Sequence, residues 1–196
     1  MTTTAKKTTT KTVKVKTTKI PVLSKIPFAF EVLDAASKQR TKAKKIEVLK
    51  TYAHDSIMAL LIWNFDETAI SLLPEGDVPY GNTREDNSMT GTLSDKINDA
   101  VGKMAEMGSN SLGSQDQGKA SIRKEYTKFY NFLKGGNDKL SSLRRETMFI
   151  NILEGLHPLE AEILILVKDK KLTDKYKITK EIASLAYPQI TWGGRS

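Results

Sequence analysis

The chain has 196 residues and no cysteine, and its 31 lysine or arginine residues against 23 aspartate or glutamate residues give a formal net charge of +8. This length suits one domain, or two small ones, with a buried core. The lack of cysteine excludes disulfides, thiolate metal sites, cysteine nucleophiles and iron–sulfur clusters. No apolar run approaches the roughly 20 residues that cross a bilayer, and no signal peptide is visible, so we expect no membrane partner.

Residues 1–20 form a low-complexity arm rich in lysine and threonine. The six lysines of residues 1–19 face no acid, so this stretch carries +6 of the net charge and the rest of the chain only +2. Threonine and lysine bury too little apolar surface to offset the entropy of ordering, so we expect disorder. The candidate residues for binding nucleic acid or an acidic partner are Lys6, Lys7, Lys11, Lys14, Lys16 and Lys19. The alternative is a solubilising tail without a specific partner, which we favour less because the separation of charge is complete.

Residues 21–80 are predicted to be an N-terminal helical half. The segment 20–27 is extended because it contains two prolines. Apolar spacing then predicts short helices at 28–38, 42–53, 55–65 and 66–73. Asp55 and Asp66 are the expected N-caps of the last two helices, since a short carboxylate accepts from the free amides of a first turn. Pro74, Gly76 and Pro79 predict a stop.

Residues 81–118 are predicted to be a flexible insertion or linker between two helical halves. The stretch is rich in glycine, serine, asparagine, aspartate and threonine, a composition typical of linkers. One marginal helix, at about 93–107, is expected within it.

Residues 119–196 are predicted to be a C-terminal helical half. A helix at 119–133 is expected to end at the glycine pair 135–136. A last helix at 179–186 has Thr179 as its expected N-cap and Pro188 as its stop.

The stretch 140–172 between them has the densest apolar pattern of the chain, and we expect the other elements to be arranged around it. Helical spacing predicts one helix that ends near Gly155 and a second that begins at about Pro158, with Leu159, Ile163, Leu166 and Val167 on its buried face. The run 163–167 is apolar on all sides, which also suits a buried strand; its helix-forming flanks favour a helix.

A second candidate basic face lies on the predicted helix 119–133. Its members are Arg123, Lys124, Lys128 and Lys134, interleaved with tyrosine and phenylalanine. Such a face can follow a phosphate backbone. The aromatics, however, recur at the spacing of a core-facing stripe, so ordinary amphipathicity is the interpretation we favour.

Three weaker patterns point to other chemistry. Glu154 and His157 have the Glu-x-x-His spacing of carboxylate-bridged metal sites, but no second copy exists and the helix breaks at His157, so a helix-end histidine is favoured. A helix-turn-helix at the C-terminal end is disfavoured because the connection 172–178 is too long. No nucleophile elbow or phosphate-binding loop is present. We therefore expect no catalytic residue, no metal and no cofactor.

Three segments resemble a family of functionally uncharacterised proteins of T4-like tailed phages, notably marine phages and cyanophages. They are NFDETAISLLPEGDVPY, LRRETMFINILEGLHPLEAEILILVKDKKL and ITKEIASLAYP. The similarity covers most of 28–80 and 120–192, and excludes the arm and the insertion. It implies a phage origin and an α-rich fold, and it supplies no catalytic or ligand-binding residue.

The sequence therefore predicts an all-α protein with two small helical halves that share one core, a flexible central insertion and a disordered basic arm. The function we expect is that of a non-enzymatic phage accessory protein in the host cytoplasm, which engages nucleic acid or a nucleoprotein complex through the arm. One alternative is a structural interaction protein of the virion or scaffold, and another is a host-directed inhibitor that binds a host protein. The sequence does not determine the oligomeric state.

Overall fold

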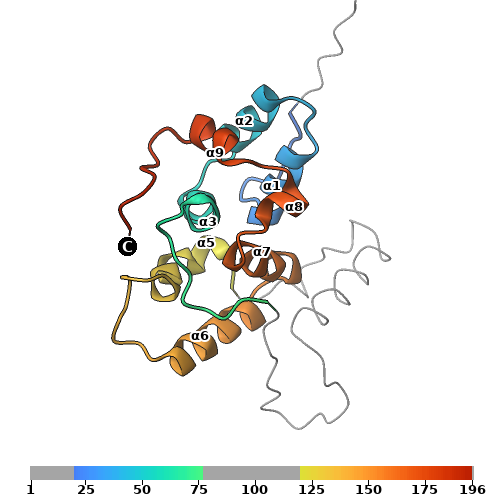
Figure 1. The fold of residues 1–196 in the computed structure, drawn as a ribbon. Helices are drawn as coiled ribbons and strands as arrows, with labels where there is room; N and C mark the ends of the chain where they lie inside the picture. Colours follow the sequence, from blue (N-terminus) through green and yellow to red (C-terminus); the bar gives the residue numbers. More distant parts are fainter. Residues whose placement is uncertain (1–19, 77–119, 196) are drawn as a thin grey trace, which may run out of the picture.

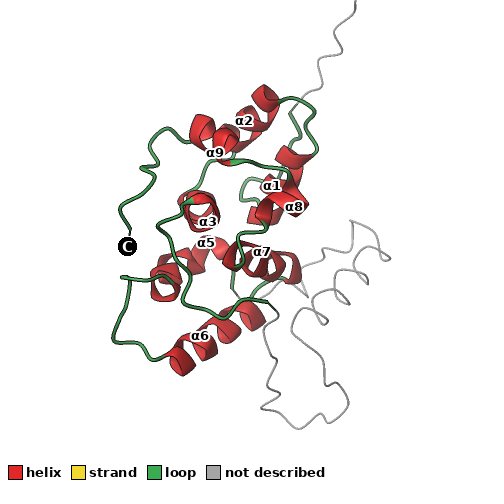
Figure 2. Ribbon diagram, in the orientation of Figure 1, coloured by secondary structure: helices red, strands yellow, loops and turns green. Residues whose placement is uncertain are grey.

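The computed structural model describes residues 20–76 and 120–195, which fold into helices joined by loops (Figure 1). Figure 2 shows no strand in these ranges, where the only β-type pairing is an isolated bridge between Ser71 and Leu133. The all-α class is confirmed for this part of the chain. The helices are α1 (Ala29–Ser37), α2 (Lys42–Thr51), α3 (Asp55–Phe65), α5 (Ile122–Glu125), the 3-10 helix η2 (Tyr126–Phe132), α6 (Ser142–Gly155), α7 (Pro158–Lys168), α8 (Leu172–Tyr176) and α9 (Lys180–Ala186).

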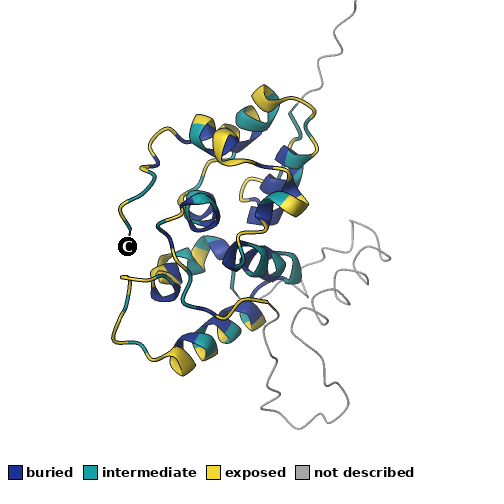
Figure 3. Cartoon of the chain, in the orientation of Figure 1, coloured by how far each residue is buried: buried dark blue, intermediate teal, exposed yellow. Residues whose placement is uncertain are grey.

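Helix α3 lies in the middle of the fold because its sequence is apolar around most of its circumference. Ile57, Leu60, Leu61 and Trp63 are each at most 1% exposed. The helix packs against α5, η2, α7 and α9, and Figure 3 shows buried residues along the sides of the surrounding helices that face it. A helix without a polar face has to be covered on several sides, and the neighbours of α3 provide that cover.

Helices α6 and α7 form the predicted corner and share the central position with α3. Helix α6 ends at Gly155 and α7 begins at Pro158, as the sequence predicts. Helix α7 packs against α1, α3, α6 and α8. The run 163–167 is helical, so the buried-strand alternative is wrong. The predicted buried face is rotated slightly, because Leu159 and Leu166 are only partly buried whereas Leu164 is fully buried.

An aromatic cluster joins the two halves of the chain. The indole of Trp63 on α3 stacks on Phe132 of η2 at a centroid distance of 5.8 Å, and Phe132 meets Phe149 of α6 edge-on at 5.2 Å. Phe129 of η2 also meets Trp63 edge-on, at 5.4 Å. Such pairs contribute about 0.5–1.5 kcal/mol each beyond their buried area. The buried residues of both halves form one cluster, which confirms the predicted shared core.

The predicted helix at 66–73 is wrong, because the chain there forms an irregular loop that pairs with the end of η2. Asp66 is not an N-cap; its Oδ1 accepts from the backbone N–H of Thr68 at 3.0 Å and from the Thr68 hydroxyl at 2.7 Å, which closes a turn. The N–H of Leu72 donates to the Phe132 carbonyl at 2.8 Å, and the N–H of Lys134 donates to the Ile70 carbonyl at 2.9 Å. These pairings with a distant segment override the local helix propensity.

Four smaller expectations also differ. His54 caps α3, and Asp55 is the first helical residue. The helix predicted from 119 begins at Ile122 and tightens into η2 from Tyr126, so the glycine pair does not close it; Leu133 does, in an extended conformation. The connection expected at 172–178 contains α8. The insertion 81–118, its helix at 93–107 and the arm 1–20, apart from residue 20, lie outside the described residues.

Candidate nucleic-acid interface

The arm lysines predicted to bind an anionic partner lie outside the described residues. These are Lys6, Lys7, Lys11, Lys14, Lys16 and Lys19. The case for these lysines as a binding site therefore rests on sequence and charge alone.

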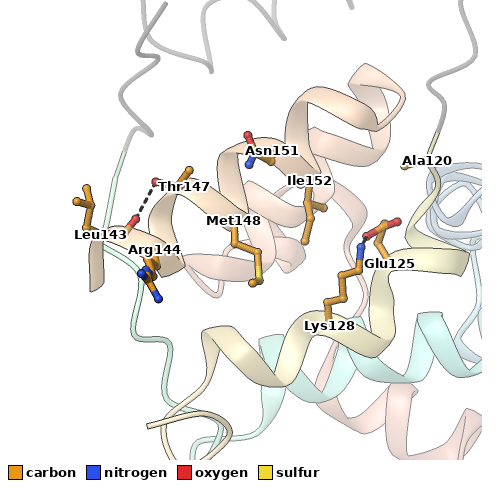
Figure 4. A pocket seen from close by; sticks show the side chains of 9 residues that line it. All are labelled: Ala120, Glu125, Lys128, Leu143, Arg144, Thr147, Met148, Asn151 and Ile152. Carbon is orange, nitrogen blue, oxygen red and sulfur yellow. Dashed lines mark hydrogen bonds and ion pairs between the residues drawn. The ribbon is translucent and has the colours of Figure 1, made fainter. Parts of the chain in front are cut away.

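The second candidate basic face is only partly assembled. Arg123 is half-buried, and its Nη2 donates to the Pro27 carbonyl at 3.3 Å. Lys128 is paired with Glu125 at 2.6 Å, and Figure 4 shows the two side chains pointing toward each other. Lys124 and Lys134 are exposed. Because η2 turns every 3.0 residues instead of 3.6, the α-helical spacing that would align Lys124 with Lys128 is not kept. The four residues do not form one continuous basic face.

The aromatics on the same segment divide between the core and the surface. Phe129 and Phe132 are buried against Trp63, which confirms the interpretation of ordinary amphipathicity for this side of the segment. Tyr130 differs, since 54% of it is exposed. One exposed ring next to two free lysines is too little for a stacking platform, which needs successive bases on successive aromatics.

A groove of about 560 Å³ runs between the α5–η2 segment and α6 (Figure 4). Its apolar floor and rim include Ile152, Met148 and the exposed Leu143. Arg144 stands at its edge, and the Thr147 hydroxyl donates to the Leu143 carbonyl at 2.8 Å instead of into the groove. Glu125, the one acid of the lining, is paired with Lys128. The groove thus offers contact area and no acid–base pair for catalysis.

Glu160 is a buried carboxylate that holds three helices together. It is 0% exposed; Oε1 accepts from the Ala29 N–H at 3.1 Å and Oε2 accepts from the Ile122 N–H at 2.9 Å. Each donor is the first residue of its helix, α1 or α5, and would otherwise be one of the unpaired amides of a helix start. Burial raises the pKa of Glu160, and the two N–H donors and the charge of Arg123 limit the rise. The sequence does not reveal this role, because the two donors lie 131 and 38 positions from Glu160.

Both histidines are helix caps. The Nδ1 of His157 accepts from the Leu159 N–H at 3.2 Å, and its ring stacks on Phe30 at 5.1 Å. The Nδ1 of His54 accepts from the Ser56 N–H at 3.1 Å. Burial lowers the pKa of His157; burial and then the charge of Arg123 lower that of His54. In its neutral form, each ring uses Nδ1 to accept a backbone hydrogen bond, so this nitrogen has a structural role. In the part of the chain that the structure describes, no three His, Asp or Glu side chains are grouped to hold a metal ion.

Two more buried charges anchor loops. The Oδ2 of Asp66 accepts from the Gly193 N–H at 2.9 Å and pairs with Arg195, which fixes the C-terminal segment to the loop after α3. Burial alone would raise the pKa of Asp66, but hydrogen bonds from Gly193 and Thr68 and the charge of Arg195 bring it to about 2. Lys168 is paired with Asp169 and donates to the carbonyls of Pro74 and Gly76 at 2.7 and 3.0 Å.

The described chain is thus an all-α protein whose inward-facing charges serve the fold. The chain belongs to a family of proteins described as "Family of unknown function (DUF6433)", whose pattern matches residues 32–101 and 107–174. No curated protein and no solved structure matches the chain. In the described ranges, no helix is long and apolar enough to cross a membrane. The family description names no activity, ligand or source, so the resemblance to phage proteins stays a prediction.

Proposed function

We propose that this protein is a non-enzymatic accessory protein of a tailed phage that engages nucleic acid, free or in a nucleoprotein complex, through its basic arm. The observation that carries the proposal is the separation of charge along the sequence. Residues 1–19 contain six lysines and no acid, whereas residues 20–196 contain 25 basic and 23 acidic residues. The phage origin rests on the resemblance of the three segments quoted above.

The use of the ionisable groups in the described ranges supports a role without catalysis. Perturbed carboxylates and histidines mark catalytic sites when they meet in a cleft. Here Glu160 is enclosed between helix starts, Asp66 is enclosed by the C-terminal segment, and His54 and His157 accept from backbone amides. None of these four side chains lines the groove beside α6.

The contact between a lysine ammonium and a phosphate determines how the arm would bind nucleic acid: without sequence preference and with strong salt dependence. An ammonium is a point charge that contacts phosphate oxygens and reads no base, so the binding is independent of sequence. Each phosphate neutralised on a duplex contributes about −0.9 to the slope of log affinity against log salt, so six contacts give at most about −5. The arm therefore supplies affinity that falls steeply as salt rises.

The test uses the full chain, labelled duplex and single-stranded DNA, and two salt concentrations. A variant with all six arm lysines changed to glutamine is compared with one in which the same lysines become arginine. We expect the glutamine variant to lose most of the salt-dependent affinity and the arginine variant to keep it. If the natural chain binds neither DNA at low salt, the proposal is wrong, and a protein is then the partner to test for the arm. If the glutamine variant binds as well as the natural chain, the arm is not the contact.

A further inference from the structure

A group of lysines gathers where the first turn of α2 meets the junction between α8 and α9. The Nζ of Lys45 donates to the Lys177 carbonyl at 2.7 Å, and Lys42 pairs with Glu181 at 2.6 Å. Lys180 begins α9 and lies over the Trp192 ring at 5.5 Å. We call the four residues Lys42, Lys45, Lys177 and Lys180 the α2–α9 basic surface. Lys42 and Lys45 lie more than 130 positions from Lys177 and Lys180, and the fold brings the two pairs together.

Helices α2 and α9, which support this surface, pack side by side (Figure 1). Lys42 meets Glu181 near the starts of the two helices. Near their ends, the Tyr187 hydroxyl donates to the Leu49 carbonyl at 2.7 Å, and both residues are buried. Lys42, Lys45 and Lys180 therefore stand on packed helices, and Lys177 lies in the short connection between α8 and α9.

Among the described acids, Glu181 is the one that pairs with a lysine of this surface. The sequence 38–45, KQRTKAKK, has five basic residues and no acid, and Lys38 in this run pairs with Asp34. Glu181 is already paired with Lys42, and burial together with the charge of Lys177 lowers the pKa of Lys45. The first turn of α2 contains no acid, which is the reverse of what the helix dipole favours. Lys45 and Lys177 repel each other, and an anion beside them would relieve that repulsion.

The chemistry of the surface favours phosphate over a protein partner. Protein interfaces centre on aromatic or apolar anchors that become fully buried. The residues on either side are Thr41 and Thr179, whose hydroxyls already accept from the Lys44 and Ile182 amides at 3.4 Å. Trp192 is partly buried beneath Lys180. Lys42 already pairs with Glu181 and Lys45 already donates to a carbonyl, so a phosphate would contact the Lys177 ammonium and the remaining N–H donors of these two.

We propose that the α2–α9 basic surface is a second contact for the phosphate backbone of nucleic acid, which the arm engages first. The inference rests on the proposed function and adds a fixed contact on the folded body to it. A nucleic acid that binds at both places is bound more tightly than by the arm alone. Binding stays independent of sequence because lysines contact only the backbone.

The test compares two full-length variants that remove equal charge. Lys42→Gln, Lys45→Gln and Lys177→Gln together remove the surface, while Lys180 is kept because it covers Trp192. Lys25→Gln, Lys50→Gln and Lys139→Gln remove three exposed lysines elsewhere. With labelled duplex DNA, we expect the first variant to bind at least fivefold more weakly at low salt, with a salt slope shallower by up to about 2.7. The second should stay within twofold of the natural chain.

The remaining outcomes separate the inference from the function on which it rests. If both variants weaken binding equally, net charge and not the surface is responsible, and the inference is wrong. If neither does, while the arm glutamine variant loses binding, the arm acts alone and the proposed function stands without this surface. If the natural chain binds no DNA, both fail. A circular dichroism melt of each variant confirms that folding is unchanged.

Discussion

The charges inside this molecule and the charges on its α2–α9 edge are used in opposite ways. Inside, Glu160 and Arg145 each meet a full set of backbone partners: Glu160 accepts two N–H bonds, and Arg145 donates to the carbonyls of Asn131, Asn137 and Leu140 at 2.8, 3.1 and 3.0 Å. At the edge, Lys45 and Lys177 lie together with no acid between them. The interior charges have buried partners within the fold, whereas Lys42 and Lys45 at the edge have one partner each and keep N–H donors for a ligand.

This contrast separates charges that stabilise the fold from charges that can bind a partner. A buried ion persists only when hydrogen bonds replace its lost hydration, so its removal costs the fold. An exposed lysine beside another lysine costs little to remove, and what it contributes must be sought in binding. The contrast predicts large losses in the free energy of unfolding at the interior charges, and at the edge lysines small changes in that free energy but a loss of binding.

The largest effect is expected at Glu160. Glu160→Ala leaves the Ala29 and Ile122 amides without their acceptor, and loss of one partner of a buried polar contact predicts about 3–5 kcal/mol of lost stability. Glu160→Gln should cost less, about 1–3 kcal/mol, because the amide keeps one acceptor but turns a donor toward the other N–H. Urea denaturation measures both, with the exposed Glu154→Ala as control. Equal effects at Glu160 and Glu154 would contradict the assignment.

A smaller loss is expected at Arg145, where a neighbour provides the matched control. Arg145→Ala removes three hydrogen bonds to carbonyls of η2 and of the loop that follows it, which predicts about 2–4 kcal/mol of destabilisation. Arg144→Ala, one position away and exposed, should stay within about 0.5 kcal/mol. Arg145→Lys should rescue only part, since a single ammonium cannot reproduce the planar fork. Thermal melts of the three variants give the comparison, and full rescue by lysine would argue against the fork geometry.

A pH-dependent loss is expected from Asp66. Its pKa in the fold is about 2, below the ordinary 3.8, so the unfolded state takes up a proton first as pH falls. The contribution is therefore fully present above about pH 4 and is lost as pH falls to about 2, with a size of about 1–2 kcal/mol after allowance for the partly exposed Arg195. Denaturation of the natural chain and Asp66→Asn at several pH values tests this. A natural chain whose stability over that range falls no more than that of the variant would contradict it.

The smallest effect on stability is expected at the α2–α9 edge. Lys177→Gln relieves the repulsion that Lys45 experiences, and its backbone carbonyl still accepts from Lys45. We expect a change within about 0.5 kcal/mol, and a gain instead of a loss at low salt. Urea denaturation at two salt concentrations measures it. A loss above 1 kcal/mol would place Lys177 with the structural charges.

Local sequence signals predicted most helix positions because those signals act within a few residues. Pro158 set the start of α7, Thr179 capped α9, and the apolar run of α3 gave its bounds. The failures are long-range. The loop at 66–73 follows from pairing with η2, and Glu160 acts on Ala29, which is 131 positions away. The spacing of apolar residues along the sequence carries no information about contacts between such distant positions.

The candidate site divides in the same way. Aromatic spacing correctly placed Phe129 in the core, but it could not show that Arg123 and Lys128 have partners in the fold. The run 38–45 has five basic residues and no acid, but in the sequence it indicates no more than the start of a predicted helix. Only the packing of α2 against α9 brings it beside Lys177.

The most direct measurement is a lysine footprint of the full chain with and without single-stranded DNA. Acetylation by an amine-reactive reagent, followed by mass spectrometry, gives the accessibility of each lysine in one experiment. We predict slower acetylation in the arm and at Lys42, Lys45 and Lys177, with no change at Lys25, Lys50 and Lys139. Unchanged acetylation throughout, or protection spread evenly over all exposed lysines, would contradict the claim that the arm and the α2–α9 basic surface bind the phosphate backbone.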